Sequence, residues 1–143
     1  MHAQELVMDH ARDPVGEWLH WIEDPQCPDR FTALSRLGFH PDPRLPAALT
    51  KMLRTGAPRD LGEEGYMRQT SAVLAIQAMA RCGEPAVDEL IGLLDADLGR
   101  FGSTMNSAAF HRVIAGRLSE ITHEGFGADQ AAWRRWREQR GKQ

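Results

Sequence analysis

Two Glu-x-x-His pairs have residue types and a spacing that can bind a metal ion: Glu17 with His20, and Glu120 with His123. On a helix, residues three apart share a face, so each pair would present a carboxylate and an imidazole together. In four-helix bundles such pairs supply half of a di-metal site, and two further helices each add a glutamate. The glutamates that could complete such a site fall at predicted helix starts or at positions that look exposed: Glu63, Glu64, Glu84 and Glu89. We therefore interpret both pairs as polar surface residues and predict no metal site.

Nucleophiles and bases elsewhere lack the sequence context that catalysis requires. No G-x-S-x-G elbow surrounds any serine, and the loop at 55–65 lacks the lysine and the strand of a phosphate-binding loop. His111 follows Phe110 in an apolar stretch, which favours a partly buried, hydrogen-bonded histidine over a catalytic base. Cys27 and Cys82 have no zinc-binding spacing and suit a reducing cytoplasm as small apolar residues. We predict no catalytic residue and no cofactor.

A tryptophan pair near the C-terminal end, Trp133 and Trp136, lies among arginines. Aromatic rings beside arginines can bind single-stranded nucleic acid by stacking and phosphate contact. Alternatively, the two tryptophans seal the end of a helical stack, and Arg134, Arg135 and Arg137 form its wet face. The formal net charge is −3, so the chain has no overall attraction to nucleic acid. We favour the structural interpretation and do not expect a nucleic-acid partner.

Charge is unevenly distributed along the chain. Residues 1–29 carry seven acids against Arg12 alone, whereas residues 128–143 carry five bases against Asp129 and Glu138. Ordinary solvated faces explain such runs, but a charged end can also contact a partner of opposite charge.

Length and composition indicate a single all-α domain. The 143 residues are 42% apolar and 26% charged, which is typical of a globular chain, and aromatic residues make up only 7%. β-branched residues are few, whereas Ala, Leu, Arg and Glu are common, which favours helix over sheet. No apolar run is long enough to span a membrane, and residues 1–13 do not resemble a signal peptide. We expect a cytoplasmic protein without a membrane segment, although a signal removed before this numbering begins stays open.

The stretch 68–94 organises the predicted fold, because it reads as a helical hairpin with nearly all its faces apolar. A long helix over 66–82 ends at Cys82-Gly83, and a second over 85–96 begins at Glu84-Pro85. Such a hairpin must be covered by neighbours. Five other helices are predicted. One follows Asp13-Pro14, one begins at residue 28 or 29, and one follows Asp42-Pro43. The fourth begins at a Ser103 cap, and the last contains Trp133 and Trp136.

The chain contains an internal repeat. The pattern Ala33-Leu34-x-x-Leu37-Gly38 matches Ala78-Met79-x-x-Cys82-Gly83 at an offset of 45, and Arg117-Leu118-x-x-Ile121-Thr122 at a further 39. A second predicted helix follows each copy. Periods near 40 with two helices each indicate α-solenoid repeats. We predict one domain over 1–143, with repeats at 28–55, 66–97 and 103–140 and an N-terminal helical cap at 1–27.

The run from Ala78 to Leu94 and the closing segment from Ile121 to Trp136 resemble short bacterial HEAT-like repeat proteins, a type first recognised among phycobilin lyases. The resemblance is good over 68–137, fair over 29–54 and absent over 1–27. It departs from the family pattern at Thr122, where a glycine is expected. The resemblance implies a short right-handed α-solenoid of stacked helical hairpins. The family pattern specifies packing and carries no catalytic residue to transfer.

We expect a non-catalytic protein–protein interaction or scaffold domain, because stacked hairpins give a curved, preformed surface. The predicted partner surface comprises the 55–65 loop and exposed residues of the second helices, Lys51, Arg54, Glu89 and Asp95. One alternative is a lyase-like enzyme or accessory protein that binds a small ligand near His40, Tyr66 and Arg68. Another is a small inhibitor or immunity-type protein whose acidic N-terminal face blocks a basic partner.

Overall fold

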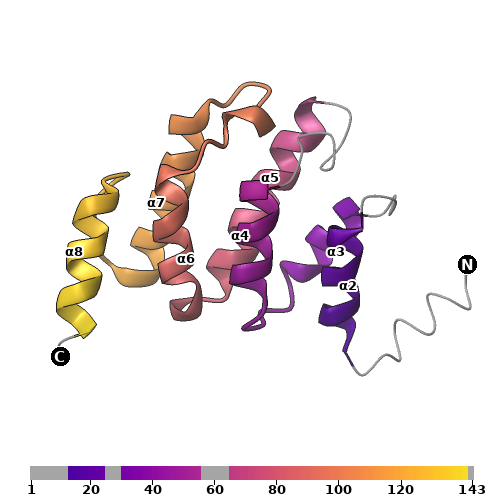
Figure 1. The fold of residues 1–143 in the computed structure, drawn as a ribbon, viewed down its shortest axis with the longest axis horizontal. Helices are drawn as coiled ribbons and strands as arrows, with labels where there is room; N and C mark the ends of the chain where they lie inside the picture. The colour runs from indigo at the N-terminus through magenta and orange to yellow at the C-terminus, as the bar shows by residue number, and fades with distance from the viewer. Residues whose placement is uncertain (1–12, 25–29, 56–64, 142–143) are drawn as a thin grey trace, which may run out of the picture.

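The computed structural model describes residues 13–24, 30–55 and 65–141, which fold into helices joined by turns and loops (Figure 1). In chain order the helices are α2 (Pro14–Glu23), α3 (Arg30–Leu37), α4 (Leu45–Thr55), α5 (Gly65–Arg81), α6 (Val87–Gly92), α7 (Ser107–Thr122) and α8 (Gln130–Gly141). Short 3-10 helices flank α6, namely η2 (Glu84–Ala86) and η3 (Leu93–Asp95), and η4 (Gly99–Phe101) precedes α7. The all-α prediction is confirmed for these ranges.

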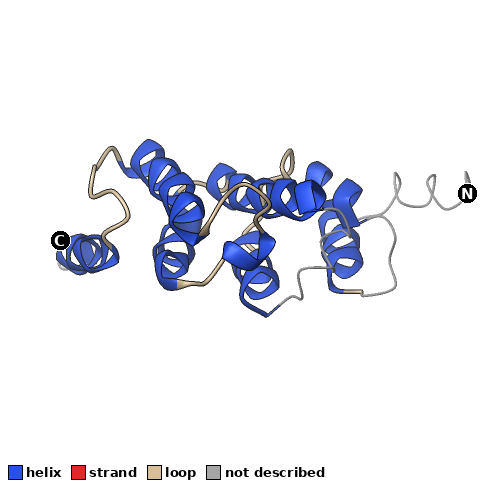
Figure 2. Ribbon diagram, turned by 90° about the horizontal axis from the view of Figure 1, so that it is seen from above, coloured by secondary structure: helices blue, strands red, loops and turns tan. Residues whose placement is uncertain are grey.

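The helices lie in two layers (Figures 1 and 2). One layer contains α2, α4, α6 and α8, and the other contains α3, α5 and α7. Within the layers, α5 packs between α3 and α7, and α6 packs between α4 and α8. From α3 onward, each helix is followed along the chain by one in the opposite layer, so alternate helices lie on the same side of the molecule.

The core fills the space between the two layers. Its largest fully buried side chains come from both layers and from the loop before α7: Leu34, Leu37, Leu45, Leu49, Leu53, Ile76, Met79, Leu90, Leu93, Phe101, Phe110 and Trp133. Trp18 of α2 is also buried, with 7% of its surface exposed. The prediction that the tryptophans near the C-terminal end serve packing is confirmed for Trp133.

Short polar side chains begin several helices, as local sequence rules predict. The carboxylate of Asp13 accepts a hydrogen bond from the Gly16 N–H at 3.0 Å, ahead of Pro14 in the first turn of α2. Asn106 caps α7 by accepting from the Ala109 N–H at 2.9 Å. Asp129 likewise accepts from the Ala132 N–H at 3.1 Å at the start of α8.

Two predicted boundaries are wrong. Ser103 does not cap α7, because its N–H donates to the side chain of Gln69 and the helix begins only at Ser107. The helix predicted over 85–96 is α-helical only over 87–92, with 3-10 turns on both sides. A helix does follow Asp42-Pro43 as predicted: the Asp42 carboxylate accepts from the Arg44 N–H at 2.9 Å, and α4 begins at the next residue, Leu45.

Some predictions concern residues outside the described ranges. The first part of the N-terminal cap, Cys27, and most of the 55–65 loop belong to these segments. No helix in the described ranges has both the length and the apolar character needed to cross a membrane.

Candidate interaction surface

The four predicted partner residues lie on or beside α4 and α6, and two of them bind each other. Arg54 forms an ion pair with Asp95 at 3.3 Å and donates to the Gly92 carbonyl at 2.6 Å. Lys51 is exposed, and Glu89 is half-buried. Arg54 and Asp95 therefore link α4 to the end of α6, whereas Lys51 forms no ion pair among the described residues.

Arg100 makes a second set of contacts at the same end of α4. Its guanidinium donates to the carbonyls of Leu53, Arg54 and Asp97, the Arg54 bond being 3.1 Å. Carbonyls in the last turn of a helix have no partner within the helix, so an arginine there completes their hydrogen bonding. The hydrogen bonds of Arg100 therefore connect the end of α4 to the loop before α7.

Arg137 joins α8 to the preceding hairpin. It forms ion pairs with Glu84 of η2 and with Asp88 of α6, the latter at 2.9 Å, and these hydrogen bonds raise the pKa of Arg137. A hollow of ≈ 290 Å³ lies beside it, lined by Asp88, Ile91, Gly92, Arg134, Arg137 and Glu138. Acids and bases alternate around this hollow, so it offers no strong preference for a partner of either charge.

The other layer carries a pronounced excess of positive charge. Helices α3, α5 and α7 contain six arginines and one acid: Arg30, Arg36, Arg68, Arg81, Arg112, Arg117 and Glu120. The helices of the α2–α4–α6–α8 layer, with η2 and η3, instead contain seven acids and six bases: Glu17, Glu23, Glu84, Asp88, Glu89, Asp95, Glu138, Lys51, Arg54, Arg134, Arg135, Arg137 and Arg140. Both layers thus contain six bases, but the helices of the α3–α5–α7 layer contain far fewer acids, and Arg30 is the one of its arginines that is buried.

The basic layer is hollowed on both sides of α5. A hollow of ≈ 180 Å³ between α3 and α5 is lined by Leu34, Ser35, Gly38, Phe39, Leu74, Gln77, Ala78 and Arg81. A second, of ≈ 200 Å³ between α5 and α7, is lined by Gln77, Ala80, Arg81, Arg117, Glu120 and Ile121. Gln77 and Arg81 line both, so the two hollows form one surface, which we call the α5 groove.

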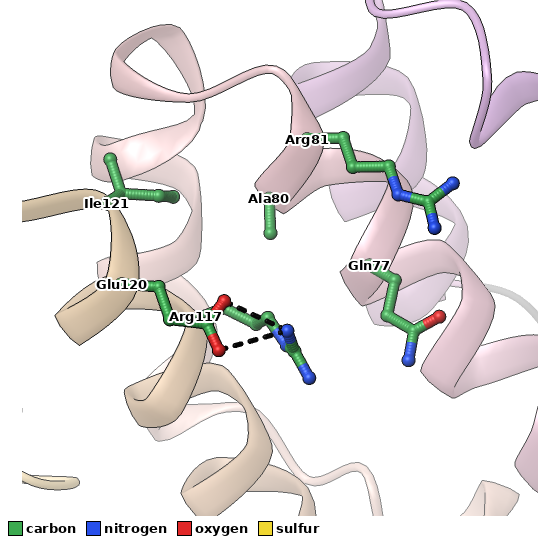
Figure 3. A pocket seen from close by; sticks show the side chains of 6 residues that line it. All are labelled: Gln77, Ala80, Arg81, Arg117, Glu120 and Ile121. Atoms are coloured by element: carbon green, nitrogen blue, oxygen red, sulfur yellow. Dashed lines mark hydrogen bonds and ion pairs between the residues drawn. The ribbon is translucent and has the colours of Figure 1, made fainter.

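Figure 3 shows the α7 side of the α5 groove. Arg117 and Glu120 form an ion pair at 2.9 Å, and across the hollow they face Ala80 and Gln77 of α5. The guanidinium of Arg81 turns away from this hollow toward α3, where it donates to the Gly38 carbonyl at 2.7 Å. There it also lies over the ring of Phe39, 5.1 Å from the ring centroid.

Phe39 is the most exposed large apolar side chain in the described part of the chain, with 74% of its surface accessible. It lies in the turn after α3, at the edge of the hollow between α3 and α5. An aromatic ring beside an arginine and a groove is a frequent anchor in protein interfaces. The α5 groove therefore combines accessible apolar surface with positive charge.

The structure does not bring together two of the residues, His40 and Arg68, that were predicted to lie near a small ligand. His40 packs against Trp18 with ring centroids 4.9 Å apart, at the end of the molecule where Arg81 meets Gly38. Arg68 lies thirteen residues before Arg81 on the same helix, about 20 Å away at a rise of about 1.5 Å per residue. His40 and Arg68 are therefore far apart.

The remaining candidates for chemistry have structural contacts. His111 Nε2 lies 2.7 Å from the Ala96 carbonyl oxygen, which confirms the prediction of a partly buried, hydrogen-bonded histidine. Cys82 is a half-buried free thiol, and burial raises its pKa, which makes it a poor nucleophile. Glu17 and His20 lie exposed on α2, whereas Glu120 pairs with Arg117. Among the described residues, no group of three or more His, Cys, Asp and Glu side chains could hold a metal ion.

The α5 groove was missed by the sequence reasoning, although part of its signal is visible there. The segments 30–37 and 65–81 contain arginines but neither aspartate nor glutamate. A count of charge for each helix separately would have found this, whereas a count over the whole chain conceals it. Comparison of the chain with protein-family models, with curated proteins and with solved structures finds no match.

Proposed function

We propose that this chain is a non-catalytic protein-interaction domain, built as a right-handed HEAT-like α-solenoid, and that its α3–α5–α7 face binds an acidic partner. The solenoid part of the proposal is supported by the repeat period and by the alternation of successive helices between two layers. A cytoplasmic location belongs to the same proposal, since Cys82 is a free thiol that suits a reducing compartment.

The segregation of charge between the two layers is the observation that carries the proposal. Charged residues on a surface that serves only solubility are expected to be mixed in sign. The exposed charges of α3, α5 and α7 depart from that expectation, because they comprise three arginines and Glu120, and Glu120 already pairs with Arg117. Arg36, Arg81 and Arg112 are exposed and form no ion pair with an acid within the described part of the chain. Exposed positive charges without acidic neighbours attract an acidic partner.

The inhibitor-type alternative receives less support from the N-terminal acids. The carboxylate of Asp13 binds Arg44 through two hydrogen bonds of 2.7 Å and caps α2. Glu17, Glu23 and Asp24 are the other acids of that segment in the described ranges, whereas Glu5, Asp9 and Asp29 lie outside them.

The test is affinity capture from a lysate of the source organism, at low and high salt, with mass spectrometry of what stays bound. The wild type is compared with Arg36→Glu/Arg112→Glu on the basic layer and with Lys51→Glu/Arg135→Glu on the other layer. Both double variants change the net charge equally, and all four arginine and lysine side chains are exposed. The lysate is treated with nuclease so that nucleic acid does not bridge proteins.

We expect one stoichiometric protein with the wild type and with Lys51→Glu/Arg135→Glu, and its loss with Arg36→Glu/Arg112→Glu and at high salt. If both double variants capture the partner protein equally well, the assignment of binding to the α3–α5–α7 face is contradicted. Co-purification of a chromophore, metal or metabolite without any protein would favour the small-ligand alternative instead. Thermal unfolding of each variant establishes beforehand that the fold is intact.

A further inference from the structure

The outward side of α5 is unusually apolar for a helix at a surface. Val73, Leu74, Gln77 and Ala80 are half-buried, so none of the described elements covers them fully. The whole helix contains no aspartate, glutamate or lysine. The solvent-facing side of an amphipathic helix normally carries charged residues, so the composition of α5 suits a side that another molecule covers.

The two hollows of the α5 groove lie on opposite sides of this helix. One is bounded by α3 and the other by α7, and Gln77 reaches both. Helices packed side by side lie about 8–10 Å apart, so furrows on the two sides of one helix are separated by a similar distance. A ligand that crosses α5 can fill both hollows only if its apolar groups match that spacing.

We propose that the α5 groove binds an acidic amphipathic helix of a partner protein, which crosses α5 and places one apolar side chain in each hollow. Residues seven apart in a helix share a face and lie about 10.5 Å apart along the axis, which matches the separation of the furrows. Phe39 and Leu74 then contact one anchor, and Ala80 and Ile121 contact the other. This inference rests on the proposed function and names the partner class for the same face.

The charges around the groove determine which sign of charge the partner carries. Arg81 lines both hollows without an acidic partner among the described residues, and exposed Arg112 lies about two turns before Glu120 on α7. Arg117 is neutralised by Glu120. A carboxylate on the flank of the bound helix would therefore pair with Arg81, while its apolar stripe faces the floor.

The lining of the groove favours a protein over a nucleic acid. In the hollow between α3 and α5, Leu34, Leu74 and Phe39 are apolar and offer phosphate groups no hydrogen-bond donor, and its side-chain donors are Ser35, Gln77 and Arg81. Apolar anchors flanked by carboxylates suit both the apolar part of the groove and the charge of Arg81, as in complexes where a helix lies in a groove.

The experiment measures binding of the full chain to a stapled helical peptide of about 18 residues by fluorescence anisotropy. The peptide carries glutamates and two leucines at positions i and i+7. A second peptide of identical composition and charge has its leucines at i and i+5, which lie on opposite faces of the helix. A single-stranded oligonucleotide of the same charge is the third probe.

Two variants test the position of binding, and one matched variant controls for charge. Gln77→Trp fills both hollows without removing a core side chain, and Leu74→Glu places a charge on the floor. Ala47→Glu makes a comparable change at an exposed position of α4 in the other layer. Gln77→Trp keeps the test decisive if Leu74→Glu fails to fold.

We expect the i, i+7 peptide to bind at least about tenfold more tightly than the i, i+5 peptide, because only the former places both anchors in the groove. Gln77→Trp should weaken its binding by at least about tenfold, and Ala47→Glu by less than about twofold. Raising NaCl from about 0.05 to about 0.5 M should also weaken it several-fold.

Equal binding of the two peptides would overturn the inference, because charge alone would then explain association. Preferential binding of the oligonucleotide would overturn it in favour of a nucleic-acid partner. If neither peptide binds while lysate capture still depends on Arg36 and Arg112, the proposed function stands and the amphipathic helix is excluded as its ligand. If both tests fail, the proposed function fails as well.

Discussion

The side-chain amide of Gln69 exchanges two hydrogen bonds with Thr104. Its Oε1 accepts from the Thr104 N–H at 2.8 Å, and its Nε2 donates to the Thr104 Oγ1 at 3.0 Å. The same oxygen accepts from the N–H groups of Ser103 at 2.8 Å and Met105 at 2.9 Å. One side chain at the start of α5 thus satisfies three successive backbone donors in the loop before α7.

Replacement of Gln69 by alanine should lower the free energy of unfolding by about 1–2 kcal/mol, because three backbone donors lose a shared acceptor. Urea denaturation followed by far-UV circular dichroism measures the change. Gln77→Ala is the matched control on the same helix and should change stability by less than about 0.5 kcal/mol. Gln69→Glu keeps the acceptor and should retain most of the stability. Equal losses for Gln69→Ala and Gln77→Ala would show that the hydrogen bonds contribute nothing measurable.

Arg44 should contribute stability that depends on pH. The Asp13 carboxylate accepts hydrogen bonds from Arg44 and from the Gly16 N–H, and these lower the pKa of Asp13 from 3.8 to about 2. Hydrogen bonds from Arg44 also lower the pKa of Asp42. A carboxyl group whose pKa is lower in the folded chain stabilises the fold above its unfolded pKa and loses that effect as pH falls through its folded pKa.

The melting temperatures of wild type and Arg44→Met should therefore differ by a constant amount above about pH 5 and converge as pH falls toward about 2. Arg112→Met, at an exposed arginine without an acidic partner in the described ranges, should show no such convergence. A difference for Arg44→Met that is independent of pH would assign its role to packing of the side-chain stem rather than to its charge.

Contacts between neighbours in the sequence were predictable, and those between distant residues were not. The cap of α2 follows from the adjacent Asp13 and Pro14. The failed prediction at Ser103 has its cause 34 residues away, in Gln69. The pairing of Arg54 with Asp95 spans 41 residues and reflects which helices lie side by side. The arginine-rich composition of alternate helices is visible in the sequence, but its concentration on one face depends on how the helices alternate between layers.

Trp133 should be the most costly single side chain to remove from α8. It is fully buried, its indole N–H donates to the Gly127 carbonyl at 2.7 Å, and it meets Phe126 edge-to-face with centroids 4.9 Å apart. Trp133→Ala should lower the free energy of unfolding by about 3–5 kcal/mol, and Trp133→Phe by about 1–2 kcal/mol. Trp136→Ala, at the half-buried neighbour, should cost less than Trp133→Ala in the same denaturation experiment. Similar losses at both positions would show that the end of the fold is not anchored by Trp133.

Among the described residues other than glycine, only His123 has a positive φ, which is 62°. His123 follows the last residue of α7 and adopts the left-handed conformation. Gly83, in the turn after α5, also has a positive φ of 72°, but its ψ of −136° differs from the 23° of His123. The family pattern places a glycine at Thr122, whereas the left-handed position lies one residue later. A side chain in this conformation strains the backbone through its Cβ atom, which glycine lacks.

His123→Gly should therefore raise the free energy of unfolding by about 0.5–1 kcal/mol, the gain being limited by the greater freedom of glycine in the unfolded chain. His123→Ala removes the imidazole but keeps Cβ, and it should produce no such gain. Thermal and urea unfolding of the three proteins separate the two effects. If the alanine variant gains as much as the glycine variant, the imidazole is the source of the instability, and relief of backbone strain is excluded.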